Sequence, residues 1–215
     1  MSNLANSATR PRVTLTQGIL VGVRLQQSLP QAVEAFLGVP YAIPPIGERR
    51  FRPAVHLPAS TSILDASKCG PAAPGKQLRA GLSPELEYSE DCLTANIFRH
   101  AHGDALERTE DKLPVAVYIH GGAFNRGTSS MHKTASMVAH SHEPFVAVSF
   151  NYRIGALGFL PSGLSAKEGI LNLGLRDQIL LLEWVQDNIT AFGGDPGNVT
   201  LIGLSAGAHS VSGLL

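Results

Sequence analysis

Hydrophobic and polar positions follow one pattern in the first part of the chain and another in the second. Residues 13–25 alternate around Gln17-Gly18, which predicts a β-hairpin, and residues 35–41 predict a further extended segment. Residues 52–90 are rich in proline, serine and glycine, and they predict a long irregular connection with little helix. The first part of the chain is therefore expected to supply extended segments and loops.

The second part combines apolar runs with helical periodicity. Helices are predicted over residues 131–140 and 173–189, and the second of these is the stronger. Its apolar residues recur at three- and four-residue spacing, which predicts one buried face made of Leu175, Ile179, Leu182, Val185 and Ile189. Two glycines and a proline within residues 192–196 end it. Strands are predicted over residues 93–98, 115–119, 145–150 and 199–202.

This alternation of strands and helices predicts the α/β class, with a mostly parallel sheet covered by helices on both faces. A ligand site is then expected beyond the carboxyl ends of the strands. Residues 1–12 are polar and are predicted to be a flexible N-terminus, which leaves residues 13–215 as one domain. The length of 215 residues and the hydrophobic share of 44% are enough for a substantial core.

Charge and hydropathy exclude two classes of partner. The chain has 17 basic and 17 acidic residues and no basic cluster, so nucleic-acid binding is not expected. The apolar runs are much shorter than the roughly 20 residues of a membrane-spanning helix, so no membrane span is expected. No basic start followed by an apolar core is visible at the N-terminus, so no secretory signal is predicted. Cys69 and Cys92 could be a disulfide pair or two separate buried thiols, and the compartment stays open.

The motif Gly203-Leu204-Ser205-Ala206-Gly207 is the main candidate for chemistry. It follows a predicted strand and precedes small residues that can form a helix, which is the setting in which a Gly-x-Ser-x-Gly turn exposes a nucleophilic serine. The alternative is a serine that caps a helix. We favour Ser205 as the nucleophile because glycines at both ends suit a crowded, strained turn.

A second glycine motif strengthens this interpretation. His120-Gly121-Gly122-Ala123-Phe124 follows another predicted strand, about 80 residues before the serine motif. Backbone N–H groups of such a loop, together with the N–H of Ala206, could hold the oxyanion that forms during acyl transfer. A structural glycine-rich connection is the alternative reading of either motif alone, and two such motifs after separate strands argue against it.

Seven segments spread along almost the whole chain carry a resemblance. They are residues 36–42 (FLGVPYA), 89–93 (SEDCL), 120–124, 151–153 (NYR), 172–178 (NLGLRDQ), 183–185 (EWV) and 192–200 (FGGDPGNVT). In these segments and in their order, the sequence resembles the amino-terminal part of the type B carboxylesterase family, which includes cholinesterases and related lipases.

The resemblance implies an α/β-hydrolase fold and hydrolysis of small-molecule carboxylic esters without a cofactor or metal. It implies that Ser205 is the acylated nucleophile and that Gly121, Gly122 and Ala206 form the oxyanion hole through their N–H groups. It also implies a Cys69–Cys92 disulfide, and with it secretion.

The chain departs from the family pattern in two ways. Leu204 stands where the family usually has an acidic residue. The family's triad acid and histidine lie downstream of the serine, so this chain corresponds to a domain that stops after the nucleophile turn. Low activity is therefore expected of these residues alone, and a non-catalytic cholinesterase-like binding protein or an inactive truncated paralogue remains an alternative. Val199–Leu204 would form an open sheet edge that favours association, and the oligomeric state is left open.

Other titratable residues receive structural interpretations. His209 lies one helical turn after Ser205, but the turn directs the serine away from that helix, which disfavours His209 as the base. His120 is expected to shape its loop rather than to transfer protons. Glu90 and Asp91 are expected to be partners of an arginine, with Arg153 as the candidate. The remaining histidines have no spacing typical of a metal site: His100, His102, His132, His140 and His142.

Overall fold

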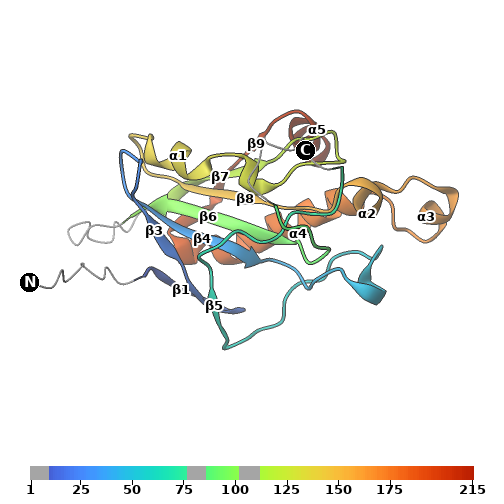
Figure 1. The fold of residues 1–215 in the computed structure, drawn as a ribbon, viewed down its shortest axis with the longest axis horizontal. Coiled ribbons are helices and arrows are strands. Elements are labelled where there is room, and N and C mark those ends of the chain that lie inside the picture. Colours follow the sequence, from blue (N-terminus) through green and yellow to red (C-terminus); the bar gives the residue numbers. More distant parts are fainter. Residues whose placement is uncertain (1–9, 77–85, 102–111) are drawn as a thin grey trace, which may run out of the picture.

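The computed structural model describes residues 10–76, 86–101 and 112–215 and contains two sheets. The larger sheet has six strands in the order β3-β4-β6-β8-β7-β9, and a small sheet of order β1-β2-β5 lies beside its β4 side (Figure 1). The strands are β1 (Arg12–Leu15), β2 (Gly18–Val21), β3 (Val23–Leu25), β4 (Val33–Pro40), β5 (Ile63–Asp65), β6 (Thr94–His100), β7 (Leu113–Ile119), β8 (Val146–Phe150) and β9 (Gly194–Gly203). The α-helices are α1 (Thr134–Ala139), α2 (Gly155–Phe159), α3 (Gly163–Lys167), α4 (Leu173–Asn188) and α5 (Ala206–Leu214).

The large sheet is mixed, which corrects the expectation of a mostly parallel sheet. Strands β8, β7 and β9 are parallel neighbours, whereas β3–β4, β4–β6 and β6–β8 pair antiparallel. The short connection between β3 and β4 permits only an antiparallel pair, because a parallel pair needs a long crossover. The α/β prediction is confirmed, and the parallel part of the sheet is the part that ends in the two glycine motifs.

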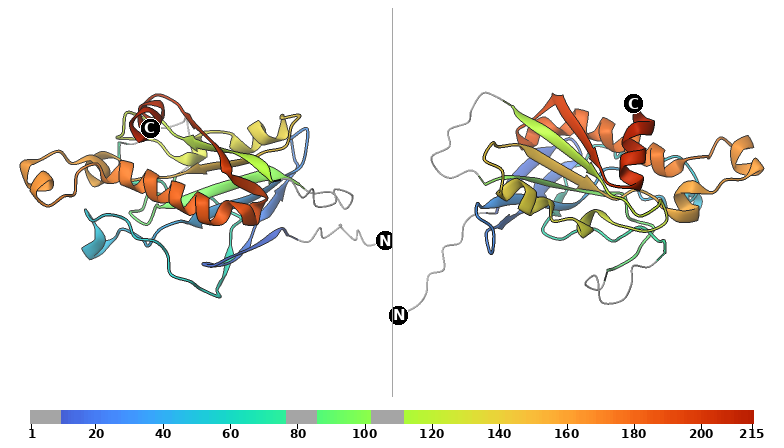
Figure 2. Two further views of the ribbon diagram at one scale, coloured as in Figure 1. Left: turned by 180° about the vertical axis from the view of Figure 1, so that it is seen from behind. Right: turned by 90° about the horizontal axis from the view of Figure 1, so that it is seen from above.

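The core lies on both faces of this sheet. All five residues of β8 are buried, and its apolar residues divide between two apolar clusters on the two faces of the sheet. Val146 and Val148 belong to the cluster that includes Trp184 of α4, whereas Ala147 packs in the cluster that includes Val138 of α1. Helices α4 and α5 lie on one face and α1 on the other (Figure 2). A continuous apolar run is therefore required at β8, as the sequence indicated.

Helix α4 buries part of the face that its periodicity predicted and several polar residues besides. Val185 and Ile189 are fully buried as expected, and Leu182 is partly buried against the core, but Ile179 is 46% exposed. The buried face also includes Asp177 and Gln178 together with Leu181, Trp184 and Asn188. Asp177 pairs with Arg153, and Gln178 donates a hydrogen bond to Ser210 of α5 at 3.0 Å. Polar residues with buried partners therefore occupy positions that hydrophobic periodicity assigns to solvent.

The N-terminal predictions hold with one change. The hairpin forms between β1 and β2, and β3 continues into the large sheet. Arg10 donates hydrogen bonds to Val21 O and Gly22 O at 2.8 Å and pairs with Asp65, so the chain is already tied to the small sheet at residue 10. Residues 1–9 of the expected flexible N-terminus lie outside the described residues. In residues 52–76 and 86–90, no helix interrupts the expected irregular connection.

The two cysteines are free thiols, so the expected Cys69–Cys92 disulfide is not formed. Cys92 is fully buried, and burial together with nearby Asp177 raises the pKa of its thiol to about 12. Cys69 lies at the surface. The two side chains therefore occupy different environments.

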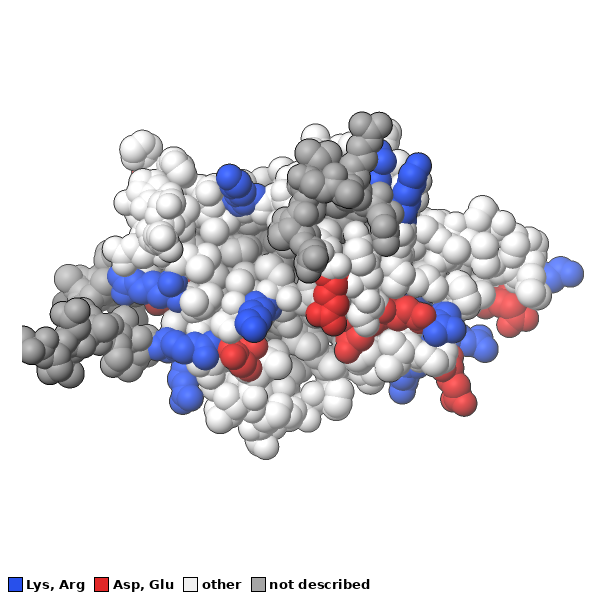
Figure 3. Space-filling view, in the orientation of Figure 1, with Lys and Arg blue, Asp and Glu red and all other residues white. Residues whose placement is uncertain are grey.

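Strand β9 is at one edge of the sheet, as expected for Val199–Leu204. Its only partner among the described strands is β7, and Ile202 and Leu204 are both exposed. Association through this edge stays a prediction. Basic and acidic residues are both spread over the face shown in Figure 3, in keeping with the net charge of zero. Among the described helices, none has the length and apolar character to cross a membrane.

Candidate active site

The two glycine motifs lie side by side because their strands are parallel neighbours. Ile119, the last residue of β7, pairs with Gly203, the last residue of β9. The chain therefore leaves both strands at the same edge of the sheet, with His120–Phe124 beside Leu204–Gly207. This is the edge at which sheets of this class place their ligand sites.

Ser205 occupies a strained turn between β9 and α5. Its backbone angles are φ 55° and ψ −119°, which a residue with a side chain rarely adopts. A Cβ at position 203 would overlap the backbone of Gly207, and a Cβ at 207 would overlap Ile119 O. Only glycine fits at both positions, and the turn leaves Ser205 exposed.

The backbone of the loop after β7 contacts this turn directly. A Cβ on Gly121 would lie 2.5 Å from Leu204 O and 3.1 Å from Ser205 Cβ. Gly122, Ala123 and Phe124 all have positive φ, at 123°, 53° and 57°. The N–H groups of Asn125 and Arg126 both donate to Gly122 O at 3.1 Å, which closes the loop. The absent side chain at Gly121 therefore allows the loop to approach Ser205.

Three N–H groups at this junction are available to a ligand. Within residues 10–76, 86–101 and 112–215, no hydrogen bond is donated by the backbone N–H of Gly121, Gly122 or Ala206. Ala206 is the first residue of α5, where N–H groups have no partner within the helix. Such donors favour an anion placed close to Ser205.

His120 is buried behind this loop, with only 1% of its surface exposed. Burial, with a smaller effect from nearby His132, lowers the pKa of the ring to about 4. The ring is therefore neutral near pH 7. This burial agrees with the expectation that His120 shapes its loop.

A buried polar network holds the far end of the loop, and the sequence reasoning did not identify it. Asn151, directly after β8, accepts hydrogen bonds through Oδ1 from Thr128 Oγ1 at 3.0 Å and from Ser129 N at 2.8 Å. Ser129 Oγ in turn accepts from Asn96 Nδ2 of β6 at 2.9 Å. The only sequence signal was the segment 151–153 that follows a strand.

Glu90 pairs with an arginine as expected, but that arginine is Arg50, at 2.6 Å, and not the candidate Arg153. Arg153 instead pairs with Asp177 through two nitrogens, with Nε to Oδ2 at 2.8 Å and Nη2 to Oδ1 at 2.6 Å. The backbone N–H of Arg153 also donates to Asp177. Glu90 and Arg50 are near enough to the surface to pair there, whereas the buried Arg153 needs an equally buried carboxylate.

The other histidines make no chemical site with Ser205. His209 is exposed, and its backbone N–H, not its ring, donates to Ser205 O at 3.1 Å. His132 Nε2 lies 3.0 Å from Tyr118 Oη, and His100 contacts Val138 O. His102 lies outside the described residues. In the part of the chain that the structure describes, no group of three His, Cys, Asp or Glu side chains could bind a metal.

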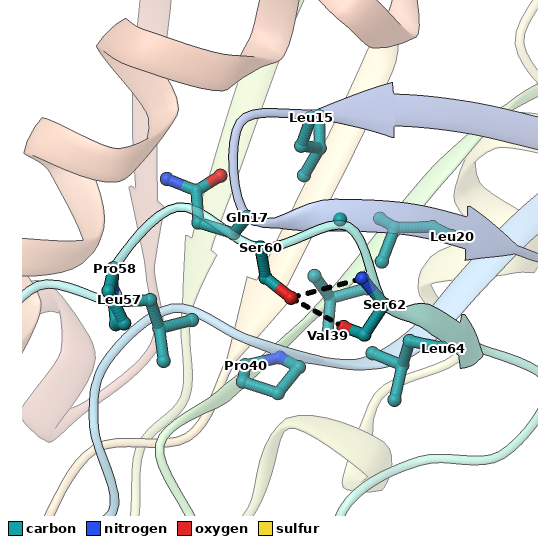
Figure 4. A pocket seen from close by; sticks show the side chains of 11 residues that line it. Leu15, Gln17, Leu20, Val39, Pro40, Leu57, Pro58, Ser60, Ser62 and Leu64 are labelled. Atoms are coloured by element: carbon teal, nitrogen blue, oxygen red, sulfur yellow. Dashed lines mark hydrogen bonds between the residues drawn. The ribbon is translucent and has the colours of Figure 1, made fainter.

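A cavity in the described residues lies away from Ser205, which is not among the residues that line it. It measures about 250 Å³ and lies between the small sheet, the end of β4 and the segment before β5 (Figure 4). Its lining is mostly apolar, and the hydroxyls of Ser60 and Ser62 bond to each other at 2.9 Å. Ser205, by contrast, stands on an open surface.

The chain is similar to known proteins over nearly all of its length. Residues 9–215 match the model of the carboxylesterase family. The chain is 45% identical over 186 residues to secreted lipase 4 of Gibberella zeae, covering 86% of this chain and 32% of that lipase. It is 40% identical to acetylcholinesterase of Gallus gallus, covering 96% of this chain and 27% of that enzyme.

Solved structures show the same relationship. A thermophilic PNB esterase superposes with a TM-score of 0.82 at 37% identity, over 96% of this chain and 41% of that one. EstA of Aspergillus niger superposes with a TM-score of 0.80 at 37% identity, over 95% of this chain and 37% of that one. The chain thus has the α/β-hydrolase fold and spans about a third of the length of the curated relatives it matches. It belongs to the carboxylesterase family.

Proposed function

We propose that this chain carries the nucleophile and the oxyanion hole of a serine hydrolase that acts on carboxylic esters. The observation that carries the proposal is the contact between the Gly121 backbone and Ser205, which stands in a strained, exposed turn. Family membership supports the same reaction class, because the relatives are named as lipases and esterases.

The reaction follows from the positions of the groups. Ser205 Oγ attacks the ester carbonyl carbon while a general base accepts the hydroxyl proton, and the carbonyl oxygen becomes an oxyanion. The free N–H groups of Gly121, Gly122 and Ala206 stabilise that oxyanion. The C–O bond to the alcohol then breaks, the alcohol takes up a proton, and water releases the acid from the acyl-enzyme.

The base is the component that the described residues do not supply. Ser205 Oγ has no hydrogen bond to any of them, and the ring of the exposed His209 has none either. A serine without a base keeps only the catalysis that binding and the oxyanion hole provide. Negligible turnover is therefore expected of residues 1–215 by themselves.

The surroundings of Ser205 favour neutral, apolar esters. Leu204, directly before the serine, is 56% exposed, and Phe124 of the oxyanion loop is half-buried against Phe159. Leu204 supplies no negative charge beside the site, so it gives no preference for a cationic substrate. We propose small-molecule esters of this kind as the substrate class.

Covalent labelling tests the proposal. A fluorophosphonate should modify the natural protein at Ser205, as located by peptide mass spectrometry. Ser205→Ala should abolish labelling and lower kcat for a p-nitrophenyl ester by about 10⁶-fold. Ser212→Ala on the exposed side of α5 is the matched control and should behave as wild type. Labelling at another serine, or full turnover by Ser205→Ala, would contradict the proposal. A folded protein with an unreactive Ser205 would favour a non-catalytic binding role.

A further inference from the structure

Two of the proposed oxyanion donors belong to peptide units whose carbonyl groups are also held by side chains. A peptide unit is planar and trans, so its N–H and C=O point in opposite directions. The N–H of Gly121 shares a peptide unit with the carbonyl of His120. The N–H of Gly122 shares one with the carbonyl of Gly121. Whatever holds each carbonyl therefore sets the direction of the donor on the other side of the plane.

Buried side chains hold both carbonyls. The hydroxyl of Tyr152 donates to His120 O at 2.8 Å, and Tyr152 is fully buried. His120 Nδ1 lies 2.9 Å from Gly121 O. A carbonyl oxygen can only accept, so this nitrogen carries the proton. The rings of His120 and Tyr152 stack with their centroids 4.4 Å apart and 17° between their planes.

We propose that Tyr152 and His120 are positioning residues that aim the N–H groups of Gly121 and Gly122 at the oxyanion. Tyr152 fixes the first peptide plane, and His120 fixes the second. The stacked rings join the two contacts into one unit. This inference rests on the proposed function, since it concerns the same oxyanion hole.

The surroundings of the pair support a rigid clamp. Tyr152 is the second residue after β8, and the intervening Asn151 N donates to Thr94 O at 2.9 Å, which ties this segment to the sheet. Behind His120, a Cβ on Gly127 would lie 2.8 Å from Nδ1 and would overlap Gly121 O. The glycine therefore leaves room for the His120–Gly121 hydrogen bond. The low pKa of His120 keeps the ring neutral at pH 7, with one proton to place.

The first test removes one hydroxyl. Tyr152→Phe in the natural protein keeps the stacked ring and loses the bond to His120 O. Loss of an oxyanion donor costs about 100- to 1000-fold, and a donor that is only misaimed should cost less, so kcat should fall by about 10- to 100-fold while KM changes less than about 2-fold.

Tyr41→Phe is the matched control. Tyr41 is equally buried, and its hydroxyl donates to a backbone carbonyl, Asn151 O, at 2.7 Å. That carbonyl's peptide unit carries the N–H of Tyr152, which is no oxyanion donor. Tyr41→Phe should lower the melting temperature about as much as Tyr152→Phe and leave kcat unchanged. An equal fall of kcat in both variants would overturn the positioning role.

The second test does not depend on activity. Nitrogen NMR of His120 at pH 7 should show the neutral tautomer with the proton on Nδ1. The amide resonances of Gly121 and Gly122 in glycine-labelled protein should shift in Tyr152→Phe and stay in place in Tyr41→Phe. A proton on Nε2, or unshifted amides in Tyr152→Phe, would overturn the inference. Failure of Ser205 to react with the fluorophosphonate would instead refute the proposed function, and the NMR result would stand separately.

Discussion

The serine turn and the oxyanion loop are built in different ways, although both follow parallel strands and both contain residues with positive φ. The serine turn is held by backbone packed on backbone, at Gly203, Gly207 and Ile119 O. The side chain of Ser205 makes no capping hydrogen bond to α5. The oxyanion loop is held by buried side chains, chiefly those of His120, Tyr152 and Asn151.

This difference predicts how each region fails. A backbone contact allows no adjustment, so any added atom in the serine turn must displace a strand or a helix. A loop held by hydrogen bonds can lose one support and keep its course, but its N–H groups then point less accurately. Substitutions of the glycines in the serine turn should therefore affect folding first, and substitutions behind the oxyanion loop should affect catalysis first.

The largest effect is expected for Gly207→Ala. The added methyl would overlap Ile119 O at the end of β7, so β7, β9 or α5 would have to shift, at a cost of about 4 kcal/mol in unfolding free energy. Gly213→Ala in the same helix meets nothing within 4 Å and should cost nothing or stabilise slightly. Urea unfolding measures both. Similar stabilities for the two variants would show that the serine turn is not held by backbone contact.

Lowering the pH is expected to reduce stability by a smaller amount. Of the two regions, only the oxyanion loop, through His120, should contribute to this loss. Burial depresses the pKa of His120 to about 4, below its ordinary value of 6.5, so the unfolded chain binds the proton more readily. The contribution of the neutral His120 ring to the free energy of unfolding is complete above pH 6.5. It decreases as the pH falls to about 4, by about 3 kcal/mol in total.

The measurement is the urea midpoint from pH 7 to pH 4 in wild type and His120→Gln. The variant should lose less stability over this range than the wild type. Ser205→Ala, in the serine turn, should retain the wild-type slope. Parallel curves for wild type and His120→Gln would show that the ring is protonated without penalty.

Gly127→Ala tests the support behind the oxyanion loop. The residue has φ 107°, and the new methyl would press on His120 Nδ1 and Gly121 O. We expect a loss of about 2 kcal/mol, because Gly121 O and the His120 ring belong to a loop held by hydrogen bonds, which can partly shift. Gly169→Ala, with φ 67° and nothing within 4 Å, isolates the backbone strain and should cost about 1 kcal/mol. Thermal unfolding compares the two, and equal costs would exclude a role for the contact.

Ala123→Gly should have the smallest effect. Ala123 has φ 53°, a conformation that glycine adopts without strain, and relief of this strain offsets the added flexibility of the unfolded chain. Stability should change by less than about 1 kcal/mol, in the favourable direction. A marked loss of stability in thermal unfolding would show that the Ala123 methyl makes a contact that the loop needs.

The sequence predicted the elements with the strongest local signals. Residues 145–150 had to be a central strand because they are almost continuously apolar, and β8 occupies that place. Periodicity identified α4 but only part of its buried face, because it counts Asp177 and Gln178 as solvent-facing. Their burial depends on partners elsewhere in the chain, Arg153 and Ser210, which no local pattern reveals.

Contacts between residues distant in sequence account for the other differences between the predicted and the observed structure. The antiparallel half of the sheet depends on the order in which strands meet. Which side chains are buried together decides two further features. Cys69 and Cys92 lie in separate environments, and Arg153 pairs with Asp177 rather than Glu90. Each is decided by a competition among partners that are distant in sequence.

By itself, the sequence determined where the chain makes its two special turns and which family they indicate. Glycines at fixed spacing after apolar strands restrict the backbone locally, so they can be recognised without the fold. Only the tertiary structure decided what holds those turns in place. Strand β7 lies between β8 and β9, which places the serine turn on one side of His120 and Tyr152 on the other. The hydrogen bonds that orient the loop follow from this strand order rather than from local sequence.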